Sequence, residues 1–131
     1  MRVVTFDPGQ DIPIIDALVR GPRDYHRVRL VFDTGAGMTQ IDSTVVELLG
    51  YSPRDGEERL SVTDATGKSV EGYSIRLKEL TLLGARLESP LVGTFDFSHF
   101  DNYRIHGLLG WDIIRTLHLE MDGPNGVLKI Y

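Results

Sequence analysis

Alternation of apolar and polar residues with a period of two is the pattern that most restricts the fold of this chain of 131 residues. Leu117, Leu119 and Met121 alternate with His, Glu and Asp, and the turn at 123–126 then leads into the apolar residues of 127–130. Successive side chains of a strand point to opposite faces of a sheet, so such alternation indicates half-buried β-strands. Further strands are expected at residues 12–19, 28–32, 60–62, 70–77, 80–83 and 87–97.

Two short helices interrupt this β pattern. The first would begin at one of the polar residues 42–44, any of which can cap it, and would end at Gly50. The second would follow Gly110, late in the chain. The sequence shows no repeat, linker or low-complexity segment, so residues 1–131 are expected to form a single all-β domain with two short helices.

Composition excludes several classes of function. The formal net charge is −5, from 14 Lys and Arg against 19 Asp and Glu, so no basic surface argues for nucleic-acid binding. The absence of cysteine excludes disulfides and zinc sites built on thiolates. The first eight residues lack the apolar segment of a signal peptide, and no apolar run approaches the ~18 residues of a membrane span. We therefore expect a cytoplasmic protein that binds neither nucleic acid nor membrane.

Residues 31–36 join a hydrophobic strand directly to an Asp-Thr-Gly turn. If the Asp33 carboxylate works in a cleft, the preceding strand would direct it there and the Thr34 hydroxyl would brace the turn. It also needs Gly35, because a residue without a side chain lets the backbone approach the carboxylate closely. Three small polar residues also form ordinary turns, so this motif alone does not fix a function.

A second motif, Leu108-Leu109-Gly110, occurs late in the chain and leads into the second helix. With both motifs, residues 12–131 resemble the retropepsin-like aspartic proteases, the single-lobed proteases of retroviral type, and in particular their cellular and bacterial members. These proteins carry a hydrophobic-Asp-Thr-Gly-Ala segment early, and two hydrophobic residues, a Gly and a helix late. The resemblance implies a retropepsin-like β-barrel with a flap hairpin. It also implies that the second motif packs behind the Asp-Thr-Gly turn and supports it.

The resemblance implies an aspartic-type endopeptidase, a hydrolase in which Asp33, Thr34 and Gly35 are catalytic and no cofactor takes part. In this chemistry two carboxylates about 3 Å apart share one proton. Because the chain contains a single Asp-Thr-Gly, a complete pair requires a homodimer to which each copy donates Asp33. The expected partners are therefore a second copy of the chain and a peptide or protein substrate.

Substrate contacts are implied at Ala36, beside the turn, and at Ala65, Thr66 and Gly67, where a hairpin tip would form the flap. An ordinary hairpin tip is the alternative for this segment. An aromatic cluster precedes the second motif, and we favour core or dimer packing for it over pockets for substrate side chains. Its members are Phe95, Phe97, Phe100 and Tyr103.

Two positions depart from the viral pattern. Viral members have an acid and an Arg, able to pair, where this chain has Gly37 and Trp111, so we expect its dimer contacts to differ from theirs. We interpret Asp112 as the N-cap of the last helix rather than as an additional catalytic acid. No metal site is expected, because none of the four His residues has the spacing of metal ligands.

A function of another class also fits the resemblance. The chain could be a peptide-binding or dimerisation module that keeps the fold with weak or no catalysis. The intact Asp33-Thr34-Gly35 favours the protease, since a binding module has no chemical need of that acid.

Overall fold

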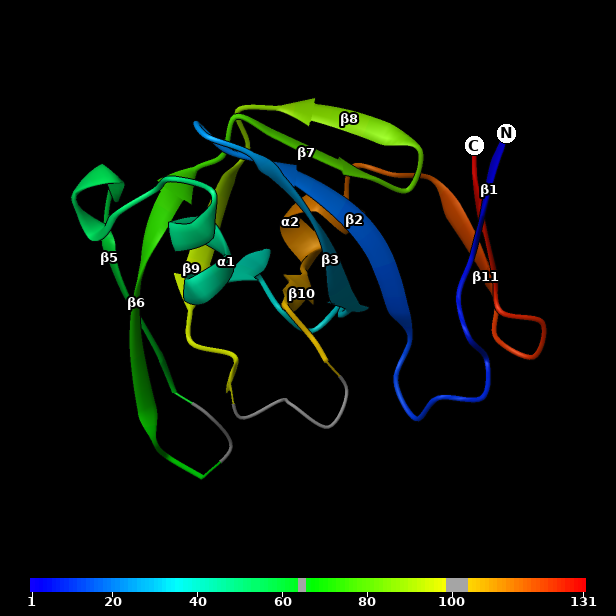
Figure 1. Cartoon of the computed structure of the whole chain (residues 1–131). Coiled ribbons are helices and arrows are strands. Elements are labelled where there is room, and N and C mark those ends of the chain that lie inside the picture. The colour runs from blue at the N-terminus through cyan, green and yellow to red at the C-terminus, as the bar shows by residue number, and fades with distance from the viewer. Residues whose placement is uncertain (64–65, 99–103) are drawn as a thin grey trace.

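The computed structural model describes residues 1–63, 66–98 and 104–131 of the chain. Within them, the strands form one nine-stranded and one three-stranded sheet. Figure 1 shows the smaller sheet beside the larger one, with the two chain termini next to each other on it. The mostly-β fold with two short helices is confirmed, although the sheets are not closed into the expected barrel.

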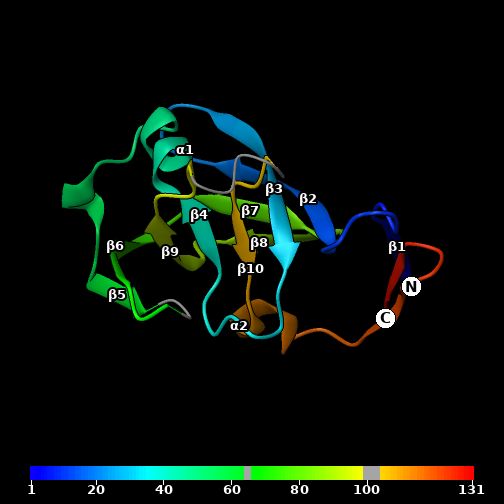
Figure 2. The same ribbon diagram turned by 90° about the horizontal axis from the view of Figure 1, so that it is seen from below.

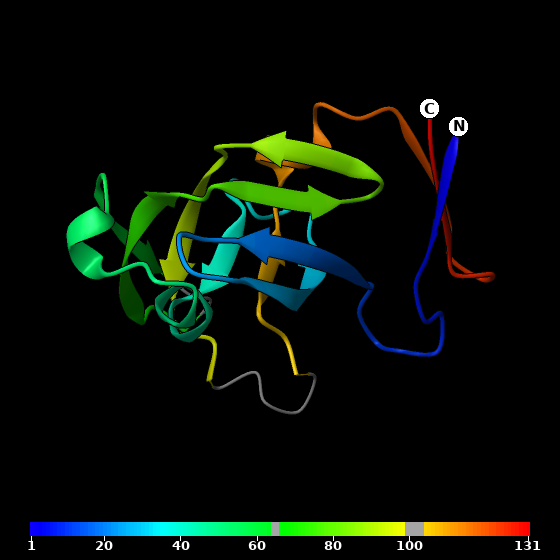
Figure 3. The ribbon, with the colours of Figure 1, turned by 45° about the horizontal axis from the view of Figure 1, so that its top comes forward.

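The larger sheet runs, in spatial order, through β5 (Arg59–Thr63), β6 (Ser69–Arg76), β9 (Leu91–Phe95), β4 (Gln40–Asp42), β10 (Gly107–Leu109), β3 (Tyr25–Phe32), β2 (Ile14–Arg20), β7 (Glu79–Leu82) and β8 (Ala85–Glu88). The smaller sheet runs through β1 (Arg2–Thr5), β12 (Val127–Ile130) and β11 (Leu119–Asp122). The helices are α1 (Ser43–Leu48) and α2 (Trp111–Ile114), and a 3-10 turn, η1 (Pro53–Asp55), precedes β5. Figure 3 shows β8, β7, β2 and β3 side by side, and in Figure 2 α1 and α2 lie at opposite ends of β4, β10 and β3.

The predicted alternation of side chains produces the core. Along β2, Ile15, Ala17 and Val19 are buried and alternate with more exposed residues. Ile15 lies opposite the buried Leu30 of β3, and Ala17 lies opposite the buried Val28. A shift of one residue between these strands would turn the apolar side chains to the exposed face, so burial of this face fixes the register.

The short strands β4 and β10, which the sequence did not predict, join the two halves of the larger sheet. β10 runs parallel to β3, with Leu109 opposite Phe32, and antiparallel to β4, with Gly107 opposite Ile41. β4 in turn pairs in parallel with β9. Three residues are too few to show a period of two, and so the pairing partners of these strands, not their own sequence, define them.

The predicted ends of α1 are confirmed, whereas the predicted N-cap of α2 is wrong. Asp42 is the N-cap of α1, and its carboxylate accepts a hydrogen bond from the backbone N–H of Thr44 at 3.3 Å. Gly50 follows the helix with a φ of 100°, a conformation that favours glycine. For α2 the expected N-cap is wrong: Gly110 occupies that position, and Asp112 lies inside the first turn.

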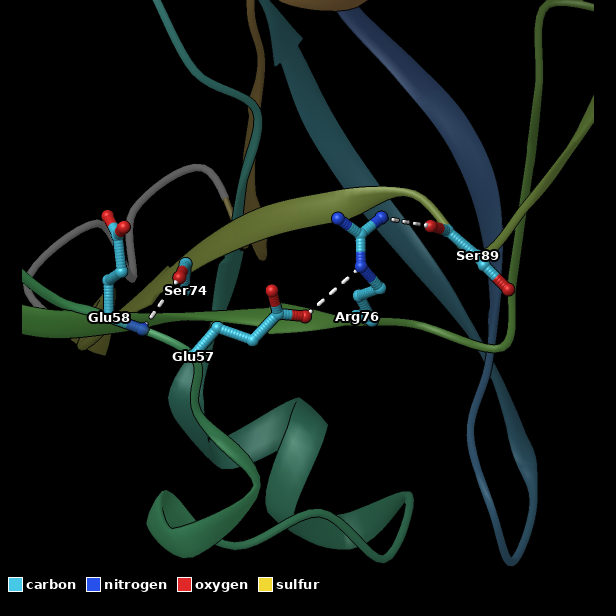
Figure 4. A network of polar contacts seen from close by, with 5 residues as sticks. All are labelled: Glu57, Glu58, Ser74, Arg76 and Ser89. Atoms are coloured by element: carbon cyan, nitrogen blue, oxygen red, sulfur yellow. Dashed lines mark hydrogen bonds and ion pairs between the residues drawn. The ribbon is translucent and has the colours of Figure 1, made fainter.

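Polar contacts hold the base of the hairpin formed by β5 and β6 (Figure 4). The N–H of Glu57 donates to the carbonyl of Ser74 at 2.8 Å, and the N–H of Ser74 donates to the carbonyl of Glu58 at 2.8 Å. Arg76 bridges the Glu57 carboxylate, at 3.1 Å, and the Ser89 carbonyl, at 3.0 Å. The Arg76 pair is exposed and contributes little, so the backbone bonds hold the base. Beyond it, residues 69–72 of β6 pair with β5 and not with β9, so the outer half of the hairpin projects from the sheet.

His106 connects three strands at the start of β10. Its backbone N–H donates to the Arg29 carbonyl at 2.8 Å, and its carbonyl accepts from the Asp42 N–H at 2.7 Å. Its ring Nδ1 accepts from the Arg29 N–H at 2.9 Å. Burial lowers the pKa of His106 below its usual 6.5, and the neighbouring His26 lowers it further. The folded protein therefore favours the neutral ring, which is the form that can accept this hydrogen bond.

We expect Gly107→Ala to destabilise the fold by about 1–3 kcal/mol. A Cβ at this position would overlap the backbone carbonyl oxygen of Gln40, which cannot move without breaking the pairing of β4 with β10. Gly123→Ala is the matched control, because a Cβ there meets no atom within 4 Å. Chemical denaturation of the two variants measures the difference, and equal stabilities would contradict this account of β10.

Acidification should destabilise the protein through His106. Because the folded-state pKa of His106 is lowered, its contribution is fully present above pH ~6.5 and is lost as the pH falls through the folded value. His106→Asn keeps a side-chain acceptor for the Arg29 N–H but cannot be protonated. We expect the melting temperature of the wild type to fall more steeply between pH 7.5 and pH 5, as about one additional proton binds on unfolding. Parallel melting profiles of the two proteins would show that His106 does not carry this dependence.

Candidate active site

The Asp-Thr-Gly turn begins where β3 ends, and strand β10 fixes its position. The backbone N–H of Asp33 donates to the carbonyl of Leu109 at 2.9 Å. Within the turn, the Gly35 N–H donates to Asp33 Oδ1 at 2.9 Å, and the Ala36 N–H donates to the Asp33 carbonyl at 3.2 Å. A Cβ on Gly35 would lie 3.2 Å from Asp33 Oδ1, which is tighter than most such contacts. The turn thus holds one carboxylate oxygen by a backbone hydrogen bond.

The expected brace from the Thr34 hydroxyl is not formed within a single chain. Thr34 is exposed, and its hydroxyl makes no hydrogen bond within the described part of the chain. The backbone bonds of Asp33, Gly35 and Ala36 brace the turn instead.

Helix α2 is bound to the segment that follows the turn. The N–H of Trp111, its first residue, donates to the carbonyl of Ala36 at 2.6 Å. The Asp112 carboxylate accepts from the Thr39 N–H at 3.0 Å and from the Thr39 hydroxyl at 2.8 Å. That hydroxyl also accepts from the Gly110 N–H at 3.0 Å, and Thr39 is 0% exposed. Thr39 was not predicted from the sequence; a polar residue between the turn and β4 gives no signal of a partner 73 positions away.

Beside the turn lies a cleft of about 490 Å³. It is formed by the segment after Asp33, by the hairpin β5–β6, by the end of β9 and by β10. Its lining residues are Gly35, Ala36, Gly37, Met38, Gln40, Val62, Val70, Phe95, Asp96, Phe97 and Leu108. The cleft is therefore mainly apolar, and Val62 and Val70, which lie opposite each other in the hairpin, contribute to it.

The predicted substrate-contact residues divide between the cleft and the hairpin tip. Ala36 lines the cleft, as does Leu108 of the second motif. Thr66 and Gly67 lie at the tip between β5 and β6 and are not part of the lining, and Ala65 lies outside the described residues. Gly67 has a φ of 83°, which favours glycine.

Two members of the aromatic cluster are buried and also line the cleft. Phe95 and Phe97 are each 5% exposed and also line the cleft, whereas Phe100 and Tyr103 lie outside the described residues. A Cβ on Gly72 would lie 2.6 Å from the Phe95 ring, so the ring packs directly against β6. Packing and cleft formation are therefore not alternatives for these two residues.

Neither a metal site nor a membrane helix is found in the described part of the chain. No group of three or more His, Asp or Glu side chains in residues 1–63, 66–98 and 104–131 is placed to hold a metal ion. No helix among these residues is long and apolar enough to cross a bilayer.

Comparison with known proteins gives two kinds of match. Residues 15–113 match the model of a family described as aspartyl protease. Among solved structures, the chain is similar to a retropepsin-like aspartic protease from Rickettsia conorii, with a TM-score of 0.69 and 15% identity over 98% of this chain and 87% of that one. It is also similar to the retroviral protease-like domain of Ddi1 from Leishmania major, with a TM-score of 0.61 and 13% identity over 97% and 88% of the two chains. No curated protein matches the sequence significantly.

The family match and the structural similarities cover the same part of the chain. The structural similarities, at these low identities, show the fold. The family match spans most of the chain and includes both the Asp33 turn and strand β10. The chain therefore belongs to the aspartyl protease family and has a retropepsin-like fold.

Proposed function

We propose that the protein is a homodimeric aspartic endopeptidase that hydrolyses peptide bonds. The observation that carries this proposal is the position of Asp33 on a hydrogen-bonded turn whose residues Gly35 and Ala36 line an apolar cleft, although Asp33 itself is not among the lining residues. The projecting hairpin β5–β6 forms another wall of that cleft. An acid beside a groove that a hairpin helps to enclose is the arrangement that this chemistry needs.

The second carboxylate would come from Asp33 of the partner subunit. Other Asp-containing turns, such as those at Asp42 and Asp122, lack the Gly two residues after the Asp and the preceding apolar strand. The turn at Asp7 has Pro8 in place of Thr. Asp112 is engaged by Thr39 and by the N–H of Ile113, so it is unsuited to act as the second acid. A two-fold axis beside the turn would bring the two copies of Asp33 together in a symmetric pair.

The reaction needs one proton shared by this pair. The deprotonated carboxylate removes a proton from water while the protonated one donates its proton to the scissile carbonyl oxygen, and the water oxygen bonds to the carbonyl carbon. The resulting diol then loses a proton from one hydroxyl to the pair while the pair protonates the nitrogen, and the C–N bond breaks. The pair ends with the one proton it started with, and no covalent enzyme intermediate forms.

The cleft supports a peptide with apolar side chains as substrate. Val62, Val70 and Leu108 present aliphatic surface to it, and Phe95 and Phe97 present aromatic surface. Burying such surface against an apolar side chain of the substrate is favourable by about 25 cal/mol per Å². Strand β4 contributes Gln40 and adds polar atoms near the turn.

Asp33→Asn should lower kcat/KM by about 10²–10⁴-fold without loss of folding, because an amide cannot take a proton from the attacking water. Asp7→Asn is the matched control. Asp7 Oδ1 accepts from the Gly9 N–H at 2.8 Å, as Asp33 Oδ1 accepts from the Gly35 N–H at 2.9 Å. Gly35 and Ala36, which follow Asp33 in its turn, line the cleft, whereas no residue of the Asp7 turn does. Cleavage of a peptide library at high protein concentration, followed by mass spectrometry, measures both variants.

The same two variants test whether the site is shared. Excess Asp33→Asn protein mixed with wild type should inhibit it, since mixed dimers contain only one acid, whereas excess Asp7→Asn should not. Undiminished cleavage by Asp33→Asn would remove the protease assignment from this site. Peptide binding by the wild type without any cleavage would instead identify the protein as the binding module considered from the sequence.

The hairpin tip gives a second test. Gly67→Val should reduce kcat/KM by about tenfold, because a β-branched residue at a φ of 83° costs about 1–2 kcal/mol and distorts the tip. Gly67→Asn is the control, since Asn tolerates the left-handed region better. A Cβ here meets no atom within 4 Å, so the strain is confined to the tip, and we expect the melting temperature of Gly67→Val to lie only a few degrees below that of Gly67→Asn. If Gly67→Val cleaves as fast as Gly67→Asn, the tip takes no part in substrate binding.

A further inference from the structure

A large apolar side chain is exposed next to the candidate catalytic turn. Trp111 begins α2 and is 49% exposed. The other exposed large hydrophobic residues of the described chain, Leu48 and Tyr25 among them, belong to other elements. Trp111 is the one whose backbone is hydrogen-bonded to the segment that starts at Asp33.

Hydrogen bonds fix Trp111 relative to the turn. Its N–H donates to the Ala36 carbonyl, which lies three residues after Asp33. The next residue, Asp112, accepts hydrogen bonds from the buried Thr39 on the same segment. The start of α2 is therefore held at two points, and an interface that includes this residue is preorganised.

We propose that Trp111 is the central apolar contact of the homodimer, and that a second copy of this chain covers it. This inference rests on the proposed function, because a shared pair requires the two Asp33 carboxylates to lie about 3 Å apart on the two-fold axis. A residue bonded to Ala36 then lies close to that axis. Thr34 and Gly35 of the turn are likewise exposed in the single chain.

The surroundings of Trp111 fit an apolar contact between the two subunits. Gly37 is exposed, and a Cβ on it would meet no atom within 4 Å, so the surface beside Ala36 offers room for a side chain of the partner. Neither Gly37 nor Trp111 carries a charge that association would leave unpaired. Tryptophan is also among the residues that contribute most when buried at the centre of an interface.

The experiment compares self-association of Trp111→Ala, Trp111→Phe and wild type by analytical ultracentrifugation. In a two-fold dimer each substitution removes two contacts, one from each copy, so a loss of about tenfold per copy raises the dissociation constant about a hundredfold for Trp111→Ala. Trp111→Phe keeps part of the apolar surface and should lie between the two. Tyr25→Ala is the control, because Tyr25 is 65% exposed but lies at the opposite end of β3, about 26 Å along the strand from Asp33.

Peptide cleavage measured against protein concentration separates an interface role from a catalytic one. Trp111→Ala should need about a hundredfold more protein to reach half of its maximal activity per subunit, and should then reach the wild-type plateau. The Tyr25→Ala curve should overlay that of the wild type.

Three results would overturn the inference. If the wild type dimerises and Trp111→Ala has the same dissociation constant, the dimer uses another face and the proposed protease function is untouched. If Trp111→Ala dimerises normally but its plateau is low, Trp111 acts on the site within one subunit. If the wild type cleaves as a monomer, the shared pair fails and the Trp111 contact fails with it, and the Asp33→Asn result then decides whether proteolysis at this site survives.

Discussion

The candidate site depends on the insertion of strand β10 between β3 and β4. The Leu109 carbonyl accepts the N–H of Asp33, so the strand sets the point at which the chain leaves the sheet and turns. One such hydrogen bond contributes only about 0.5–1.5 kcal/mol. Its importance is geometric, because the strand that supplies it is itself bonded on both edges and Leu109 is fully buried. Gly107 makes this possible, since any side chain there would overlap β4.

Local signals in the sequence predicted the parts of the fold that local chemistry determines. The alternation in β2 and β3, the cap at Asp42 and the stop at Gly50 all result from interactions between residues near in sequence. β10 could not be found in this way, because its three residues become a strand only through pairing with segments about 70 positions earlier. The cleft was likewise only partly predicted. Its lining from β5 and β6 depends on where the hairpin lies relative to the segment after Asp33, which no local pattern encodes.

The position of Asp112 shows how the same sequence signal can serve two structures. An Asp just before a run of apolar residues is typical of an N-cap, but it is equally acceptable in the first turn, where helix N–H groups also lack partners. The choice is made by Thr39, whose N–H and hydroxyl need an acceptor because the residue is fully buried. The carboxylate satisfies them and also accepts from the Ile113 N–H. A buried donor distant in sequence therefore engages this carboxylate within the first turn of the helix.

The two walls of the cleft are constrained to different degrees, and this suits the proposed function. The Asp33 wall is bonded to β10 on one side and to α2 on the other, so the position of its carboxylate is determined by the sheet. The opposite wall is a hairpin held at its base around Ser74, whose outer strands pair only with each other. Catalysis by paired acids requires a carboxylate position fixed within a fraction of an ångström, whereas a peptide must enter and leave. The hydrogen-bonded Asp33 wall meets the first requirement, and the β5–β6 hairpin, whose outer half has few tertiary contacts, meets the second.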